Sequence, residues 1–89
     1  MELSERFIAE LEREGFTTVY EWQDKPDKIY EEHSHDAKVS FYVTDGSITF
    51  DFSGVKKVLK AGERLDIPPN TRHSAVVGKE GVIYIIGEE

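Results

Sequence analysis

The stretch Gly62-Glu63-Arg64-Leu65-Asp66-Ile67-Pro68-Pro69-Asn70-Thr71-Arg72-His73 decides the fold when it is read together with His33-Ser34-His35. These two segments contain all 3 histidines of the chain. His33 and His35 are two positions apart, so on a strand their side chains point to the same face. His73 would come from a distant strand that closes over the first. Because neutral imidazole is the commonest protein ligand for divalent transition metals, the pattern indicates a metal site.

Composition narrows the class of protein. A chain of 89 residues with 38% hydrophobic and 33% charged residues is typical of one soluble globular domain. The net charge of -7 argues against nucleic acid as a partner, because binding to phosphates relies on lysine and arginine. It argues equally against an anionic membrane surface. No apolar run approaches the roughly 20 residues of a membrane helix, and residues 1–5 do not resemble a signal peptide.

The chain has no cysteine. Disulfides, thiolate metal sites and cysteine nucleophiles are therefore excluded. The composition is compatible with the reducing cytoplasm, and we expect a cytoplasmic protein that binds a small molecule, with no nucleic acid and no membrane as partners.

The first residues predict an amphipathic helix. Four apolar side chains share one helical face: Leu3, Phe7, Ile8 and Leu11. Gly15 is a natural stop, since glycine accepts the left-handed conformation at a helix end. We expect the helix to run from about residue 3 to 14 and to pack its apolar stripe on the outside of the β-strands. Residues 1–16 are assigned to this helix, as part of the same domain, and residues 17–89 to a barrel.

The remaining chain reads as about eight short strands, which favours a β-sandwich or β-barrel. Asp45-Gly46 predicts a hairpin between strands 38–44 and 47–52. The other expected strands are 17–22, 29–35, 55–60, 64–67, 74–77 and 82–86. The expected core residues are Phe41, Val43, Ile48, Phe50, Phe52, Ile67, Val76 and Ile85.

Strand 82–86 is apolar on both faces, so one face must be covered by something other than its own barrel. This favours a homodimer. Tyr42, Tyr84 and Trp22 are expected at a rim or at the dimer face.

These residues give the chain a family resemblance. It resembles the cupins, whose first motif is His-x-His, a glutamate four residues later and a glycine seven beyond that, and whose second motif ends in Pro-x-Gly-x-x-His. The matching residues are His33, His35 and Gly46 in the first motif and Gly62, Pro68 and His73 in the second. Asn70 replaces a glycine, as asparagine does where a turn needs positive φ. Over residues 17–86 the resemblance implies an all-β fold, a cupin-type jelly-roll β-barrel with one short N-terminal α-helix.

The departures from the motifs bear on function. Val39 stands at the glutamate position, and strand parity places it on the same face as His33 and His35. Asp27 replaces the glycine that usually opens the first motif, and Val77 replaces the asparagine expected after the last histidine.

We expect His33, His35 and His73 to bind one divalent transition metal: iron, zinc, nickel, manganese or copper. Three buried imidazoles without a metal would need three sets of hydrogen-bond partners, and such a metal-free trio is the alternative. Glu31 has the strand parity of a fourth ligand or of a carboxylate at the pocket mouth, but a solvated residue at the barrel rim is the favoured interpretation. Arg72 could bind a substrate carboxylate or simply be solvated, and these two assignments stay open. Asp36 could orient an imidazole or be an exposed turn residue.

Two functions fit these expectations. The first is a small metal-dependent oxygenase, isomerase or lyase that acts on a small anionic, oxygen-bearing molecule. A neutral three-histidine set leaves the full +2 charge on the metal, which favours such a ligand. The second is a non-catalytic module that binds or senses a small ligand in the same pocket. No nucleophile, no base beyond the ligands and no cofactor-binding glycine motif stands out, so whether the protein is an enzyme stays open.

Overall fold

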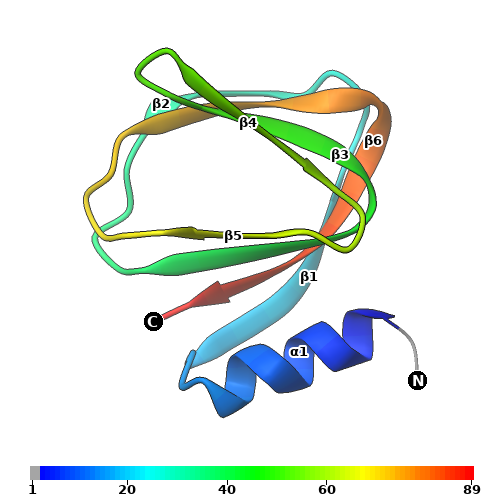
Figure 1. Cartoon of the computed structure of the whole chain (residues 1–89), viewed down its shortest axis with the longest axis vertical. Coiled ribbons are helices and arrows are strands. Elements are labelled where there is room, and N and C mark those ends of the chain that lie inside the picture. The colour runs from blue at the N-terminus through cyan, green and yellow to red at the C-terminus, as the bar shows by residue number, and fades with distance from the viewer. Residues whose placement is uncertain (1–2) are drawn as a thin grey trace.

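The fold is described by a computed structural model that covers residues 3–89, so Met1 and Glu2 of the expected helical segment lie outside the described residues. These residues form one helix and six strands: α1 (Leu3–Arg13), β1 (Thr18–Asp24), β2 (Ile29–His33), β3 (Val39–Phe52), β4 (Val55–Lys60), β5 (Arg64–Ile67) and β6 (His73–Glu88). Figure 1 shows the strands as two facing layers with α1 outside them. The expected jelly-roll fold is confirmed, although the hydrogen-bonded sheet, in the order β1-β6-β3-β4, does not close into a ring.

Two long strands, β3 and β6, build both layers. They are antiparallel neighbours from the Val39–Glu88 pair to the Asp51–Ser74 pair, and β1 and β5 extend one layer while β2 and β4 extend the other. The register between them shifts on either side of Gly46, whose φ is 75°. The strands therefore bend together from one layer into the other.

The bend corrects the expected hairpin at Asp45-Gly46. A glycine with positive φ occurs in a β-bulge as well as in a two-residue hairpin turn. The Asp-Gly dipeptide therefore predicts the backbone conformation of Gly46, but it does not predict whether a bulge or a hairpin forms. Here the chain continues through the bulge, and the strands expected at 38–44 and 47–52 are the single strand β3. In the same way, strands 74–77 and 82–86 are both parts of β6. The expected eight strands are consequently six.

The core lies between the layers. On β3, Val39, Phe41 and Val43 point into it, while Ser40 and Tyr42 point to the outer face, so the predicted inward orientation of Val39 is confirmed. Most of the expected core residues are buried, and Phe52 is partly buried. Val76 was wrongly expected there. It is 47% exposed, because its register pairs it with the outward-facing Ile29.

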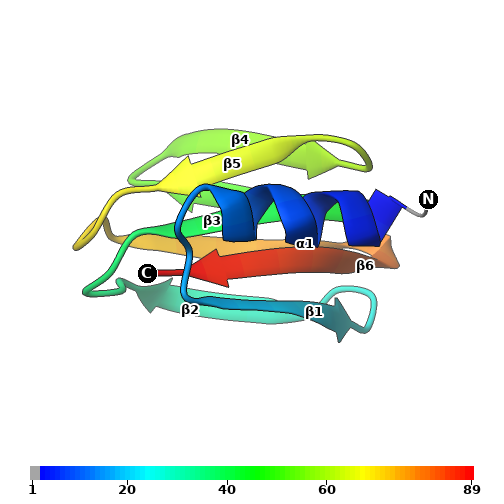
Figure 2. The same ribbon diagram turned by 90° about the horizontal axis from the view of Figure 1, so that it is seen from below.

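The helix α1 covers the outer face of β3 and β6 (Figure 2). Its buried residues pack in one apolar cluster composed of Phe7, Leu11, Phe16, Tyr42 and Ile85. The rings of Phe7 and Tyr42 are stacked, with their centroids 3.8 Å apart. Tyr42 is therefore under the helix and Tyr84 is in the core, not at a rim. On the second apolar face of strand 82–86, Ile85 is covered by the chain's own helix, and Ile83 is partly exposed.

Candidate metal centre

The structure brings the three predicted histidines together. His33 ends β2, His73 begins β6 as its register partner, and His35 lies just beyond β2. The ring centroids of His33 and His73 are 4.4 Å apart, those of His33 and His35 are 5.0 Å apart, and those of His35 and His73 are 5.4 Å apart. One ligand nitrogen from each ring lies within 4.8 Å of the other two. One metal ion could contact all three after small ring movements, since a metal–nitrogen bond is about 2.0–2.1 Å.

Backbone carbonyls orient two of the imidazoles. Nδ1 of His33 is 2.7 Å from the carbonyl oxygen of Glu31, and Nδ1 of His73 is 2.8 Å from that of Thr71. A carbonyl oxygen only accepts hydrogen bonds, so in each neutral ring Nδ1 carries the proton and Nε2 keeps its lone pair. Metal-binding histidines are held in this way by their second nitrogen. The donor set therefore fits a divalent transition metal.

The corner before His73 positions the third imidazole. Asn70 has a φ of 62°, which confirms that this residue replaces glycine in a left-handed conformation. The backbone N–H of Asn70 donates a hydrogen bond of 2.7 Å to the backbone carbonyl oxygen of His35. The segment that carries His35 is thus tied to the corner that leads into His73. Asp27, the other residue that stands where the motif has glycine, also has a positive φ, 64°.

Burial keeps two of the imidazoles, those of His35 and His73, neutral. His73 is only 1% exposed, and burial lowers its pKa, although the hydrogen bond to Thr71 opposes this effect. Burial also lowers the pKa of His35, as does the positive charge that His33 would carry, while the carboxylate of Glu88 opposes both. At neutral pH both rings are therefore in the uncharged form that binds metals.

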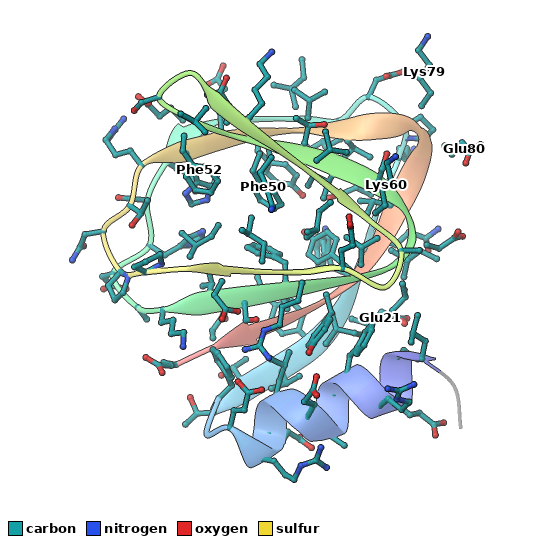
Figure 3. The ribbon with its side chains drawn as sticks, viewed as in Figure 1. Glu21, Phe50, Phe52, Lys60, Lys79 and Glu80 are labelled. Atoms are coloured by element: carbon teal, nitrogen blue, oxygen red, sulfur yellow. The ribbon has the colours of Figure 1, made fainter. Side chains whose placement is uncertain are left out.

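The histidines share a cavity of about 240 Å³ between the layers. Its walls are mainly aromatic and aliphatic: Tyr20, Trp22, Tyr30, Phe41, Ile48, Phe50, Ala75, Tyr84 and Ile86, with the three histidines and Glu88. Figure 3 shows Phe50 and Phe52 pointing from β3 into the space between the layers. Their ring centroids lie 6.2 and 5.8 Å from that of His73. The cavity is slightly smaller than the roughly 300–1,000 Å³ typical of ligand pockets, so it suits a small molecule.

Asp24 orients two aromatic residues of the cavity wall. Its carboxylate accepts a hydrogen bond of 2.7 Å from the hydroxyl of Tyr30 and one of 3.0 Å from Nε1 of Trp22. Burial, followed by the bond to Asp24, raises the pKa of Tyr30, so its hydroxyl stays protonated. The expected strand 17–22 stops short of Asp24, and sequence reasoning missed this function because nothing in the local sequence indicates which side chains meet its carboxylate.

Glu88 is the second residue that sequence reasoning missed. Among residues 3–89, it is the only carboxylate that lines the cavity with the histidines. It ends β6, where it is the register partner of both Val39 on β3 and Thr18 on β1. The expected strand ended at Ile86, whose side chain points into the core. Had the strand been extended by two residues, the alternation of side chains would have placed Glu88 on the same inward face.

The other candidate residues lie away from the cavity. The side chain of Glu31 is exposed, and this residue contributes its backbone carbonyl to His33 instead. Arg72 is exposed and forms an ion pair of 3.0 Å with Glu32. Asp36 is beside His35 at a smaller neighbouring hollow, and its charge acts to raise the pKa of His35. Neither Glu31 nor Arg72 contributes its side chain to the histidine cluster.

The fold and the site together define a small jelly-roll barrel with a histidine cluster in its cavity. The chain belongs to the cupin family, because residues 20–86 match the family model described as a cupin domain.

Solved structures share this fold. A cupin-2 domain-containing protein from Shewanella frigidimarina is 25% identical, with a TM-score of 0.69 over 79% of this chain and 67% of that one. KdgF from a Halomonas species is 22% identical, with a TM-score of 0.65 over 80% of this chain and 67% of the other. The polyketide cyclase RemF from Streptomyces resistomycificus is 21% identical, with a TM-score of 0.69 over 80% of this chain and 53% of the other.

No curated protein sequence gave a significant match. Within residues 3–89, no helix has the length and apolar character needed to cross a membrane.

Proposed function

We propose that this cupin is a metal-dependent enzyme in which His33, His35 and His73 bind one divalent transition metal. A small oxygen-bearing molecule would bind to that metal inside the barrel. The observation that carries the proposal is the convergence of three ligand nitrogens within 4.8 Å. In two of the rings, those of His33 and His73, Nδ1 is hydrogen-bonded to a backbone carbonyl oxygen. A transition metal satisfies the free nitrogens, which otherwise face an aromatic cavity.

The cavity suits oxygenase, isomerase or lyase chemistry. A bound cation would polarise a carbonyl or carboxylate oxygen of the ligand, and iron would also bind dioxygen. The aromatic walls make the cavity mainly apolar, and the hydrogen bonds from Tyr30 and Trp22 to Asp24 keep those walls in place. Since the described lining holds no lysine or arginine, the metal would supply the positive charge that binds an anionic ligand. The similarity to a polyketide cyclase supports a catalytic role for a barrel of this shape.

A non-catalytic binding or sensing module is the second candidate function. The described cavity lining holds no serine, threonine or lysine that could act as a nucleophile. Such a module would use the same metal and the same pocket without turning its ligand over.

Metal analysis of untagged protein tests the metal site. We expect His73→Ala to lose most of the bound metal, because two imidazoles replace three. Glu31→Gln is the matched control, since that side chain is exposed on the strand that carries His33. An unchanged metal content in His73→Ala would remove the site assignment.

A turnover screen then separates the two functions. The metal-loaded protein is incubated with a panel of small carboxylates and keto acids, and oxygen uptake and product formation are followed. Turnover that is lost in His73→Ala supports the enzyme. Saturable ligand binding without turnover supports the binding module.

We also propose that the protein acts in the cytoplasm. The support is compositional: the chain has no cysteine, which is compatible with the reducing cytoplasm.

A further inference from the structure

We propose that Glu88 is the carboxylate of this metal centre and coordinates the bound cation as its fourth protein ligand. The proposal deepens the proposed function and depends on it, because it requires that the three histidines bind a metal. The position of Glu88 in the sheet, its lack of a cationic partner and the charge of the histidine set each support it.

The sheet directs the side chain of Glu88 into the barrel. Glu88 is the register partner of Val39, and opposite residues of an antiparallel pair point to the same face with Cβ atoms about 4.5–5.5 Å apart. Val39 is 1% exposed and belongs to the core between the layers. Glu88 therefore points inward beside it and lines the cavity with all three histidines, whereas Glu89 is exposed.

Among residues 3–89, no lysine or arginine forms an ion pair with Glu88. The ion pairs formed within residues 3–89 join Arg64 to Glu14 and Asp66, and Arg72 to Glu32. The described lining of the cavity contains no lysine or arginine. A half-buried carboxylate is stabilised by a hydrogen-bond donor or by a positive charge. In the cavity the neighbouring donor is the neutral hydroxyl of Tyr20, whose pKa is raised by burial and then by the charge of Glu88. A bound cation would give Glu88 the ionic partner that the described lining does not supply.

The histidine set has the complementary requirement. Three neutral imidazoles leave the full +2 charge on a bound metal, and a carboxylate reduces it to +1 while adding an oxygen ligand. Within the described part of the chain, residues 3–89, the three imidazoles form the tight cluster, and the Glu88 carboxylate is not among the atoms within 4.8 Å of one another. Neutral imidazoles offer little attraction to a carboxylate, whereas a divalent cation attracts it strongly. The long, flexible side chain of Glu88 would then turn toward the metal.

The sequence alone does not reveal this ligand. Val39, on β3, is the residue that shares the predicted face with His33 and His35, and it offers no ligand atom. Glu88 provides a carboxylate from the neighbouring strand of the same layer, at the position directly opposite Val39.

The test compares Zn²⁺ affinity, measured by competition with a chromogenic chelator, in the parent and in Glu88→Gln. We expect the variant to bind Zn²⁺ about ten-fold more weakly or worse, which is at least the effect of losing an outer-shell partner of a metal site. Glu89→Gln and Glu31→Gln are matched controls, because each removes one carboxylate from an exposed position in the same part of the molecule. Both controls should keep the parent affinity. Thermal melts in chelator establish that all variants are folded.

A spectroscopic measurement separates coordination from a general effect of charge. The Co²⁺-loaded parent and variants are compared by visible absorption, which reports the ligands and geometry of the ion. We expect the spectrum to change in Glu88→Gln and to stay the same in both controls. Parent-like Zn²⁺ affinity, or weaker affinity with an unchanged Co²⁺ spectrum, would overturn the assignment of Glu88. If the parent itself fails to bind metal, the proposed function fails instead, so the two failures are distinguishable.

Discussion

Gly46 meets two requirements at the bend of β3. Its φ of 75° is in the left-handed region, and a Cβ atom at this position would lie 2.0 Å from the carbonyl oxygen of Gly81 on β6. The first requirement is conformational, while the second is a close approach of two backbones. Any side chain at position 46 would therefore push β3 away from β6 at the point where both strands pass between the layers.

We predict that Gly46→Ala lowers the free energy of unfolding by about 3 kcal/mol or more, because strain and a backbone clash add. Gly54→Ala is the matched control. Gly54 has a φ of 95° but nothing within 4 Å of the position of a Cβ, so only the conformational cost of about 1–2 kcal/mol applies. Urea denaturation of both variants measures the difference. Equal losses would show that the close approach to Gly81 carries no energetic weight.

Val39 separates the effect of metal from the effect of burial. We predict that Val39→Glu makes thermal stability strongly dependent on metal. Without metal, a buried carboxylate directly opposite Glu88 meets desolvation and like-charge repulsion, which lower the melting temperature. With metal, the new carboxylate has a cationic partner. Thermal melts of parent and variant, each with Zn²⁺ and with chelator, test this. If Zn²⁺ raises the melting temperature equally in both proteins, the side chain of residue 39 does not interact with the metal site.

The helix α1 affects stability without contributing to the metal centre. It covers Tyr42 and Ile85 on the outer face, and Glu14 just beyond it forms an ion pair of 2.7 Å with Arg64. None of the described residues of α1 lines the cavity that holds the histidines. Stability and metal binding should therefore respond differently when the helix is changed.

We predict that deleting residues 1–14 lowers the free energy of unfolding by a few kcal/mol, the scale of several lost buried side chains. Zn²⁺ affinity in the fraction that stays folded should be that of the full chain. Leu11→Ala is a milder version of the same change: this side chain is fully buried, and its truncation should destabilise by about 2–5 kcal/mol. If Leu11→Ala folds but binds Zn²⁺ more weakly, the helix belongs to the site after all.

Local signals explain which elements could be predicted from the sequence. The helix was predicted because its apolar spacing and its stop at Gly15 lie within the same few residues. The three histidines were predicted because the motifs fix their spacing. The length of β3 was not, since Asp45-Gly46 provides the same positive φ in a bulge as in a hairpin. Glu88 was missed because its place in the site depends on where β6 ends and on its pairing with β1 and β3, which are long-range properties.

A homodimer was expected because strand 82–86 is apolar on both faces. In the structure, α1 packs on the second face and covers Ile85, so this reason does not apply. The structure offers a different apolar surface. The register aligns Ile29, Val76, Thr49 and Val58 in a row across β2, β6, β3 and β4. Ile29 is 65%, Val58 49% and Val76 47% exposed, which is unusual for adjacent apolar side chains on a monomer.

We predict a homodimer that covers this row, so light scattering should give about twice the chain mass of 10.2 kDa. Val76→Lys, at the centre of the row, should shift the protein to monomer. Val55→Lys is the control, because Val55 is 70% exposed on β4 but lies outside the row. A parent protein that is monomeric at micromolar concentration would remove the prediction.

The pairing of β1 with β6 completes the wall of the metal cavity, since Tyr20 and Trp22 of β1 line it, and this bears on when the metal centre forms during folding. The hydrogen bond from Thr17 to the Glu88 carbonyl joins residues 71 positions apart, so closing this part of the sheet carries a large loop-closure cost. We expect contacts of this kind to form late, so that the cavity between the layers is incomplete until they do. Bound Zn²⁺ should therefore slow unfolding and leave the refolding rate nearly unchanged, as for any interaction absent from the transition state. Stopped-flow refolding that accelerates with Zn²⁺ would instead mean that the histidine cluster assembles before the barrel does.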